Sequence, residues 1–527
     1  MKNVAITILI IIFFNNIYAQ TPVIQWQNTI GGNQIDRITN INKTNDGGYI
    51  ISGYSNSVIS RDKTEQFFGT FDFWIIKLDN TGSINWQNTI KADGINNNTL
   101  IEETNDGGYI VVGTSSSNIA GDKTVNTKGG DDIWLLKLNN TGDILWQKSI
   151  GGNNADRPFS MSISSNNNIL IGAISFSSIS GDKSEENYGY FDYWVLELDA
   201  IGTILWQKTL GGSGNETLTS FYKTSDNGYI IGGYSNSGIS GNKTENSYGQ
   251  NDYWIIKLDF NRNIEWQKTI GGNNEDQCSS IYQTNDNGFI IGGSSNSDIS
   301  GNKTVPSKGS DDFWVMKLDM SGNILWQKSI GGINSDGISS IDKTLDGYFL
   351  LCGNSSSPIS GDKTEYNRGL EDIWIVKIDE NGTIIWDKTI GGNNQDYNAK
   401  IKHTTDNGFI LGANSNSDIS GEKTEYATST DYWIIKLAPD NLSNNTLDSS
   451  LFSIYPNPTT GIFNIKFNTT LENYIMTVRN YLGQIVKQEN VGSTNLFTNT
   501  LDAQSGFYFI ELENKNQQKY VFKILKK

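Results

Sequence analysis

Few residues of this chain have the types and spacing that catalysis needs. Its 527 residues include one histidine, His403, so a Ser-His-Asp triad would depend on that residue, and a multi-histidine zinc site is excluded. Most equivalent positions elsewhere in the chain hold Lys, Gln or Glu, so we interpret His403 as an ordinary strand residue. Cys278 and Cys352 are too few for a four-cysteine metal site or a disulfide framework. We therefore assign no catalytic residue and expect neither a metal nor a cofactor.

An aspartate and a lysine recur along the chain at a nearly constant interval. The aspartates, each two residues before a tryptophan, are Asp72, Asp132, Asp192, Asp252, Asp312, Asp372 and Asp431. The lysines are Lys63, Lys123, Lys183, Lys243, Lys303, Lys363 and Lys423. A residue that recurs in every repeat has a task in every repeat. We interpret the aspartates as acceptors for backbone N–H groups at loop ends, and the lysines as packed side chains with paired ammonium groups.

The tryptophans define the repeat that must position these residues. One set stands at Trp26, Trp86, Trp146, Trp206, Trp266, Trp326 and Trp386, at steps of 60 residues. The second set stands at Trp74, Trp134, Trp194, Trp254, Trp314, Trp374 and Trp433, and its last step is 59. Together they are all 14 tryptophans of the chain. A fixed period of this size is typical of a solenoid, a propeller or an array.

One repeat shows four expected strands. Residues 280–283 and 289–293 alternate around an Asn-Asp-Asn-Gly turn and predict a hairpin. A long polar loop leads to a third strand at 313–318, and a turn returns the chain as a fourth strand at 324–330. The third strand is apolar on both faces, as a sheet packed between two neighbouring sheets requires. We find no helical periodicity in this part of the chain.

The ends of the repeat array favour a closed ring. The array opens with an isolated fourth strand at 23–30 and finishes with a third strand at 431–437 that has no fourth strand after it. Pairing these two strands would complete the last unit and remove an open sheet edge. We therefore predict an all-β chain with a seven-bladed β-propeller of about 60 residues per blade, closed by the N-terminal strand, over 20–437. A right-handed β-solenoid is the alternative, but it would not need this split unit.

Short segments of the repeat resemble known propeller repeats. Phe289-Ile290-Ile291-Gly292-Gly293 resembles the kelch Gly-Gly strand, and the Leu-Asp…Gly…Trp pattern that ends at Trp326 is similar to quinoprotein-type strands. The 60-residue period exceeds that of kelch repeats, and nothing in the repeat indicates a quinone site. The Asp box of sialidase-type propellers does not match, because the aspartate-to-glycine spacing differs by one residue.

The N-terminus has the sequence features of an export signal. Lys2 precedes an apolar run at 4–14, and Ile17-Tyr18-Ala19 is a plausible cleavage site, so we interpret 1–19 as a signal peptide. The run is too short to span a bilayer as a helix, and we expect no membrane span. The formal net charge of −17 disfavours nucleic acid as a partner, because the chain would repel a phosphate backbone.

The last segment, 451–527, lacks the tryptophan repeat and follows a predicted linker at 438–450. It contains Tyr455-Pro456-Asn457-Pro458-Thr459 with Gly461, then Tyr481-Leu482-Gly483, then Gly506-Phe507-Tyr508 and a lysine-rich end. In this order these motifs resemble the type A C-terminal sorting domain of the type IX secretion system of Bacteroidota. The resemblance implies a small β-sandwich, the secretion machinery as a partner, and a protein released outside the cell or attached to its surface.

Function is expected where the repeats differ. The long loops vary most in their aromatic residues, and a set of tyrosines and phenylalanines among Asn, Ser and Gly is typical of an adaptable binding surface. The candidate binding residues are Phe67, Phe68, Tyr188, Tyr190, Tyr248, Tyr366 and Tyr426. These rings could also fold back to cover the loops.

Three functions remain open from the sequence. The first is a secreted or surface-displayed binding or adhesion module for a glycan or a protein. The second is a carbohydrate-active hydrolase that uses loop carboxylates, with Glu197 and Glu216 as the acids that break the repeat pattern. The third is a passive structural protein of the surface layer.

Overall fold

The structure is a computed structural model and describes residues 21–440, 452–471, 474–480, 484–492, 494–513 and 519–527. The predicted signal peptide 1–19, most of the predicted linker 438–450 and the Tyr481-Leu482-Gly483 motif lie outside the described residues. Every regular element in the described ranges is a β-strand. The chain divides into two compact units, one spanning Thr21–Pro439 and one that includes the C-terminal strands.

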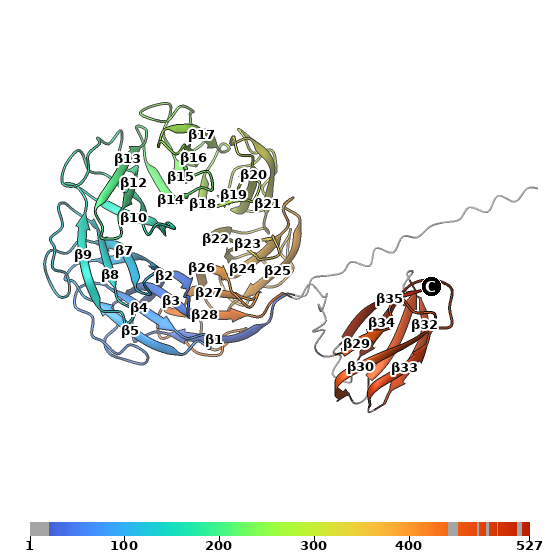
Figure 1. The fold of residues 1–527 in the computed structure, drawn as a ribbon. Coiled ribbons are helices and arrows are strands. Elements are labelled where there is room, and N and C mark those ends of the chain that lie inside the picture. The colour runs from blue at the N-terminus through green and yellow to red at the C-terminus, as the bar shows by residue number, and fades with distance from the viewer. Residues whose placement is uncertain (1–20, 441–451, 472–473, 481–483, 493, 514–518) are drawn as a thin grey trace, which may run out of the picture. The chain divides into compact units, whose positions relative to one another are not determined.

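The first unit consists of seven four-stranded antiparallel sheets arranged in a ring (Figure 1). The first, innermost strands of the blades are β2 (Asp36–Lys43), β6 (Asn96–Glu103), β10 (Asp156–Ile163), β14 (Glu216–Lys223), β18 (Asp276–Gln283), β22 (Asp336–Lys343) and β26 (Asp396–His403). The second strands are β3 (Tyr49–Ser55), β7 (Tyr109–Ser115), β11 (Ile169–Ser175), β15 (Tyr229–Ser235), β19 (Phe289–Ser295), β23 (Phe349–Ser355) and β27 (Phe409–Ser415). The third strands are β4 (Asp72–Leu78), β8 (Asp132–Leu138), β12 (Asp192–Leu198), β16 (Asp252–Leu258), β20 (Asp312–Leu318), β24 (Asp372–Ile378) and β28 (Asp431–Leu437). The fourth, outermost strands are β5 (Ile84–Ile90), β9 (Ile144–Ile150), β13 (Ile204–Leu210), β17 (Ile264–Ile270), β21 (Ile324–Ile330), β25 (Ile384–Ile390) and β1 (Ile24–Ile30).

The N-terminal strand closes the ring, as the sequence predicts. Strand β1 pairs antiparallel with β28, with Ile24 opposite Leu437 and Ile30 opposite Tyr432. The seventh sheet therefore runs in the order β1-β28-β27-β26 and joins the two ends of the repeat array. The all-β, seven-bladed propeller is confirmed.

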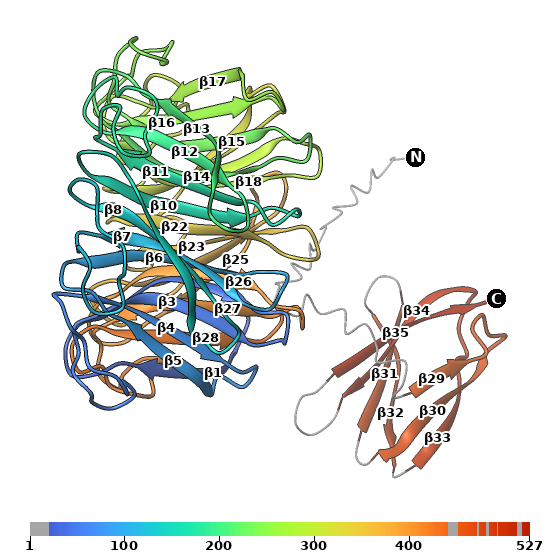
Figure 2. The same ribbon diagram turned by 60° about the vertical axis from the view of Figure 1, so that its left-hand side comes forward.

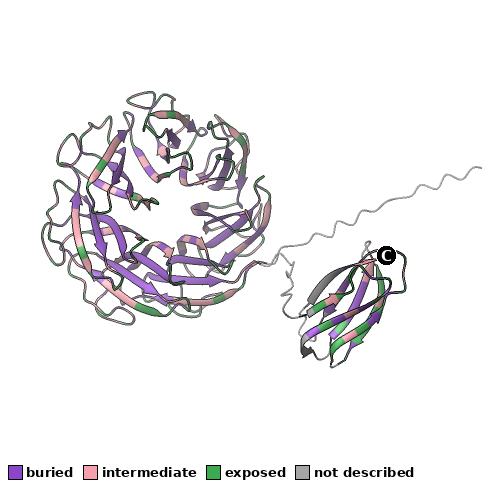
Figure 3. Ribbon diagram, in the orientation of Figure 1, coloured by how far each residue is buried: buried purple, intermediate pink, exposed green. Residues whose placement is uncertain are grey.

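The third strands form the dry interior of the ring. Every residue of β4, β8, β12, β16, β20, β24 and β28 is buried, because each of these strands lies between the sheets of neighbouring blades (Figure 3). The second tryptophan set lies on these strands and is fully buried. Each indole N–H donates to a side chain on the outermost strand, as from Trp74 to Gln87 Oε1 at 3.1 Å. The buried ring therefore leaves no unsatisfied polar atom.

The first tryptophan set has a different environment from the second. These rings lie on the outermost strands, and all except Trp386 are only partly buried. Several of them pack on the glycine of the β-turn in the next blade: a methyl group on Gly142 would lie 2.7 Å from Trp86. That glycine has φ of 89°, so it supplies both the turn conformation and the close approach.

The innermost strands begin earlier than the alternation predicts. In the fifth blade β18 starts at Asp276, where residues 280–283 were expected. Asp276 N–H donates to Asn251 O at 2.7 Å, and its carboxylate accepts the N–H of Gly272, so pairing is already fixed at this aspartate. A bulge between Cys278 and Ser280 interrupts the alternation and hides the strand start from the sequence pattern.

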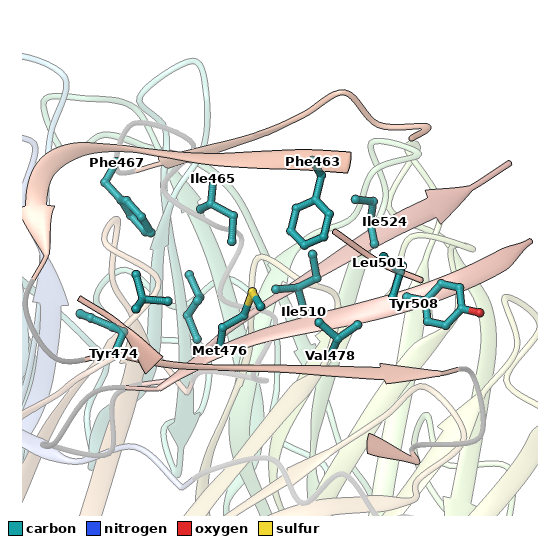
Figure 4. Close-up of a cluster of buried hydrophobic side chains, with 12 residues drawn as sticks. Phe463, Ile465, Phe467, Tyr474, Met476, Val478, Leu501, Tyr508, Ile510 and Ile524 are labelled. Atoms are coloured by element: carbon teal, nitrogen blue, oxygen red, sulfur yellow. The ribbon is translucent and has the colours of Figure 1, made fainter. Parts of the chain in front are cut away.

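The C-terminal unit is a small β-sandwich, also as predicted. One sheet contains β29 (Phe452–Tyr455), β30 (Ile462–Leu471) and β33 (Thr494–Thr500). The other contains β32 (Ile485–Val491), β31 (Tyr474–Asn480), β34 (Gly506–Glu513) and β35 (Lys519–Lys526). Figure 4 shows the core between them, where Phe463 and Ile465 of β30 face Met476 and Val478 of β31.

Candidate functional site

The strands of the ring run from one face to the other, so loops and turns collect on two opposite faces (Figure 2). One face carries the short turns that follow the first and third strands of each blade. The other carries the connections between blades and the long loops between second and third strands, and we call it the long-loop face. The long loops are residues 56–71, 116–131, 176–191, 236–251, 296–311, 356–371 and 416–430.

Each long loop is built around its recurring lysine. All seven lysines of the column are almost completely buried. Lys243 Nζ, for example, donates to the carbonyl oxygens of Ser237 and Glu245, both at 2.9 Å. Lys63 Nζ donates to Thr89 at 2.6 Å and lies 4.9 Å from the centre of the Trp74 ring. Burial lowers the pKa of Lys63 and of Lys243 to about 8, which still leaves both ammonium groups charged at neutral pH.

Each recurring aspartate ends its loop by accepting a backbone N–H four residues earlier in most blades. Asp192 Oδ2 accepts from Tyr188 at 2.6 Å, and Asp312 Oδ2 accepts from Lys308 at 2.6 Å. In the seventh blade the donor is three residues earlier, Thr428, at 3.1 Å from Asp431. Both recurring columns therefore have the structural roles that the sequence indicates.

A glutamine after the first-set tryptophan ties each loop to the blade. Gln267 accepts the indole N–H of Trp254 at 3.0 Å and donates to Asn242 O in the long loop at 2.8 Å. The sixth blade has Asp387 at this position, and its carboxylate accepts from Trp374 and from the loop residue Thr364. The sequence analysis missed this column, although Trp-Gln or Trp-Asp recurs in all seven repeats.

The predicted aromatic binding residues lie on the long-loop face but do not form one cluster. Phe67 is half-buried, whereas Phe68, Tyr188, Tyr190, Tyr248, Tyr366 and Tyr426 are exposed. The rings of Tyr188 and Tyr248 lie against glycines of the next blade, Gly241 and Gly301. Each of these two rings is therefore partly packed against the next blade and partly exposed.

Two more of the predicted aromatic residues pack on a neighbouring side chain. Tyr190 stacks on Phe176, with ring centres 6.1 Å apart. The Arg61 guanidinium lies 5.0 Å from the centre of the Tyr426 ring. The long-loop face therefore carries dispersed amphipathic rings, and none of the seven lines the cavity at the ring axis.

A ring of isoleucines on the same face was not predicted. One isoleucine stands near the tip of every long loop, and each is 44 to 64 % exposed. They are Ile59, Ile119, Ile179, Ile239, Ile299, Ile359 and Ile419. The signal was in the sequence, because every loop contains Ile-Ser or Ile-Ala four residues before the recurring lysine, within a polar stretch.

The innermost strands of all seven blades line a cavity of about 360 Å³ at the ring axis. Its lining consists mainly of hydroxyls and amides, with Asn40, Asn98 and Asn398 among them, and with Lys400 and Lys402 on one blade. Lys400 Nζ donates to Ser339 O at 2.7 Å, and burial lowers its pKa to about 8. Among the described residues that line this cavity, none is an acid.

The two acids that break the repeat pattern are held in structural contacts. Glu197 replaces a lysine of the third strand, and it pairs with Arg262 at 2.9 Å and accepts from Tyr229 at 2.8 Å. These partners hold the pKa of Glu197 below its usual range despite its burial, which is the wrong direction for a general acid. Glu216 is buried between blades and accepts from Ser235 at 2.7 Å. Neither residue supports the hydrolase hypothesis.

The single histidine also has local partners. His403 ends β26, and its Nδ1 lies 2.9 Å from Asp342 Oδ2 of the neighbouring blade. Lys43 Nζ lies 3.3 Å from its Nε2. Cys278 and Cys352 are buried free thiols in the fifth and sixth blades, and burial raises the pKa of both, so neither is an activated nucleophile.

Comparison with protein families identifies the C-terminal unit. Residues 453–527 match the family described as the secretion system C-terminal sorting domain. This confirms the resemblance to type IX sorting domains and implies export to the cell surface or the extracellular space. It also implies an interaction with the secretion machinery. Among the described residues, no helix is long and apolar enough to cross a membrane.

Comparison with curated proteins and solved structures gives similarities at low sequence identity. The regulatory protein FlaEY of Caulobacter vibrioides is 23 % identical over 178 residues, which cover 32 % of this chain and 18 % of that protein. The Pan2 WD40 domain of Neurospora crassa is similar at a TM-score of 0.41, with 10 % identity over 76 % of this chain and 89 % of that one. Sqt1 of Chaetomium thermophilum gives a TM-score of 0.40, with 10 % identity over 78 % of this chain and 100 % of that one.

Proposed function

We propose that the ring is a binding or adhesion module, displayed or released outside the cell, that contacts a glycan or a surface protein through its long-loop face. The observation that carries this proposal is the ring of seven exposed isoleucines. Single exposed apolar side chains are ordinary, but one at each loop tip makes an apolar contact that is repeated around this face.

The construction of the loops supports the same proposal. Each loop is fixed from below by a buried lysine, an aspartate and a glutamine, which Asp387 replaces in the sixth blade. Its tip is therefore presented without a large ordering cost on binding. Tyrosines and phenylalanines near the tips add amphipathic surface that suits sugars as well as proteins. Seven similar contacts also favour a repetitive ligand, because avidity multiplies weak individual contacts.

The domain organisation follows as part of the proposal. Residues 1–19 act as a signal peptide, 20–437 form the propeller, 438–450 link the units and 451–527 sort the protein. The exposed Tyr455, Pro456, Asn457 and Pro458 lie beside the end of the chain, where Asn457 Oδ1 accepts the N–H of Leu525 at 2.9 Å. Gly461 has φ of 135°, a conformation that favours glycine. We infer that this ordered corner contacts the secretion machinery.

The test compares retention of the purified protein on a panel of immobilised polysaccharides and on intact cell surfaces. One variant carries Ile119→Ser, Ile239→Ser, Ile299→Ser and Ile419→Ser. A second carries Tyr188→Ala, Tyr248→Ala and Tyr366→Ala. A control carries Ile201→Ser, Phe260→Ser and Met320→Ser, which are equally exposed but lie on the opposite face.

We expect the isoleucine variant to lose at least tenfold in retention, while the opposite-face control is retained like the unchanged protein. Polysaccharide retention that the tyrosine variant loses would identify a glycan ligand. Retention only on protein-bearing surfaces would identify a protein ligand. Equal retention of all the variants would contradict a binding role for the long-loop face.

A further inference from the structure

Two carboxyl groups meet at six of the seven junctions between neighbouring blades, beneath the long-loop face. One belongs to the recurring aspartate that begins a third strand, and the other belongs to the first residue of the innermost strand of the next blade. The pairs are Asp132 with Asp156, Asp192 with Glu216, Asp252 with Asp276, Asp312 with Asp336, Asp372 with Asp396 and Asp431 with Asp36. All twelve residues have no exposed surface.

The two members of a pair crowd the same glycine. A methyl group added to Gly331 would lie 2.0 Å from Asp312 Oδ1 and 3.1 Å from Asp336 Oδ2. Gly151 stands in the same way between Asp132 and Asp156, at 2.3 and 3.1 Å. Any side chain at these glycines would displace a carboxylate, so the first glycine of the Gly-Gly before the innermost strand leaves room for the pair.

Each pair contains carboxylate oxygens with no hydrogen-bond donor. In the pair of Asp312 and Asp336, the Oδ2 atoms accept from Lys308 N–H and Gly332 N–H, at 2.6 and 2.7 Å. The Oδ1 atoms of both residues are buried and unpartnered. The same holds for both members of the other four Asp–Asp pairs, and for Asp192 in the pair with Glu216. A buried carboxylate oxygen without a donor is costly, and a proton on one member of a pair would supply the missing hydrogen.

The seventh junction provides a natural control, because an amide replaces one carboxyl group. There Asp72 meets Asn96, and Lys91-Ala92 stands where the other junctions have Gly-Gly. Asp72 Oδ1 accepts the N–H of Ala92 at 2.9 Å, and the Asn96 amide donates to Phe71 O at 3.0 Å. Neither residue is among those with unpartnered buried atoms. Among the seven junctions, unpartnered carboxylate oxygens therefore occur only where two acids meet.

The excess of negative charge beneath the long-loop face also favours a bound proton. The junctions together hold thirteen carboxyl groups, and the cations that face them are the seven buried lysines and Arg61, which pairs with Asp431 at 2.5 Å. Six of the seven lysines lie between two of these carboxyl groups, as Lys183 does between Asp156 and Asp192. The carboxyl groups of the junctions outnumber these eight cations by five, and five pairs have no arginine.

We propose that each of these five pairs binds one proton in mild acid, shared as an O–H···O hydrogen bond between its two carboxyl groups. The proton converts one acceptor into a donor and supplies a hydrogen for the unpartnered oxygens. It also removes one negative charge from each of the five pairs. A metal ion fits less well. Calcium needs six to eight oxygens, and no group of three or more acidic, histidine or cysteine side chains in the described residues could hold a metal.

The propeller is consequently stabilised by mild acid. Burial raises the pKa of Asp132, Asp252 and Asp372 to about 6, and that of Asp192, beside Glu216, to about 8. Above the pKa of an unfolded aspartate, near 4, the folded chain holds these protons and the unfolded chain does not. The free energy of unfolding therefore falls as pH rises from about 4 through 6 to 8.

The test measures the unfolding temperature of the full chain between pH 5 and pH 8.5, for the unchanged protein and for Asp276→Asn and Asp336→Asn, which copy Asn96. We expect the unchanged protein to lose stability across this range, and each variant to unfold about 2–4 °C higher than it at pH 8. Asp226→Asn, a change at an exposed turn aspartate, is the control and should not flatten the pH profile. A pH-independent unfolding temperature, or variants destabilised equally at all pH values, would overturn the proposal.

A second measurement works even if the variants fail to fold. The infrared carbonyl band of protonated carboxyl groups should be present in the unchanged protein at pH 5.5 and should weaken towards pH 8.5. Its absence at pH 5.5 would refute the shared proton. An unfolding temperature that falls with a chelator and returns with calcium would replace the proton by a metal ion.

Discussion

The buried lysine is the residue on which each long loop depends. Its ammonium group is nearly inaccessible, yet it stays charged, because carbonyl and hydroxyl oxygens surround it and carboxylates lie on both sides. A buried charge with full hydrogen bonding is tolerated, whereas a buried charge that has lost its partner is costly. The lysine column is therefore a structural requirement of the fold, and its recurrence in all seven blades follows from that.

Replacing one of these lysines should be strongly destabilising. We expect Lys243→Met to lower the free energy of unfolding by about 3 to 5 kcal/mol, because Asp252 and Glu216 lose their nearby cation. Chemical denaturation at pH 7 measures the change. Lys223→Met, at an exposed position of the same blade, should change stability by less than about 0.5 kcal/mol. Equal effects of the two substitutions would show that the buried ammonium group contributes nothing.

At the scale of elements, strand β1 determines whether the seven blades form a closed ring. It supplies the outermost strand of the seventh blade, where Gln27 accepts the indole N–H of Trp433 at 2.9 Å. Thr29 of the same strand accepts from Lys423 at 2.8 Å. The last repeat therefore obtains Gln27 and Thr29, which contact its tryptophan and its lysine, from the other end of the repeat array. Without β1, the third strand of this blade has a free edge.

Removing this strand should open the ring. A chain that begins after Ile30 is expected to lose the cooperative unfolding transition of the intact protein or to associate through the free edge of β28. Light scattering and thermal unfolding measure both effects. A peptide of residues 22–31, added in excess, should restore the monomer and raise the unfolding temperature. A truncated chain as stable and monomeric as the intact one would show that closure by β1 is dispensable.

The strands were predictable because the period of the repeat and the alternation of apolar and polar residues can both be read along the chain. The 60-residue spacing of the tryptophans, the two-sided apolar third strand and the isolated strand before Gly31 determine the blade count and the closure. The start of each innermost strand was not predictable in this way, because a bulge near Cys278 interrupts the alternation. The clustering of the aromatic residues could not be predicted either. Whether Tyr188 joins a binding surface or packs on Gly241 depends on contacts between blades 53 residues apart in sequence.

At the scale of the whole molecule, the pKa values of the carboxyl groups are shifted in opposite directions on the two faces of the ring. Beneath the long-loop face, buried carboxyl groups hold protons, which makes the folded state more stable in mild acid. On the opposite face, the third-strand lysine pairs with an aspartate of the first turn in six blades, as Lys257 does with Asp226 at 2.8 Å. Hydrogen bonds from lysine, threonine and backbone N–H groups lower the pKa of Asp226 to about 2, and that of Asp106 likewise. The ring should therefore be most stable at a pH between the two titrations.

The acid limb of this profile is a separate prediction. A carboxyl group with a lowered pKa contributes stability above the pKa of the unfolded residue, near 4, and that contribution is lost as pH falls towards 2. The lysines of these pairs are almost fully buried, so a protonated aspartate leaves a buried ammonium group with fewer partners. We expect the unfolding temperature to rise from pH 2 to a maximum near pH 4 to 5 and then to fall towards pH 8. Asp106→Asn with Asp226→Asn should weaken only the acid limb, and Asp276→Asn only the limb above the maximum. If one set of substitutions changed both limbs equally, the two faces would not titrate independently.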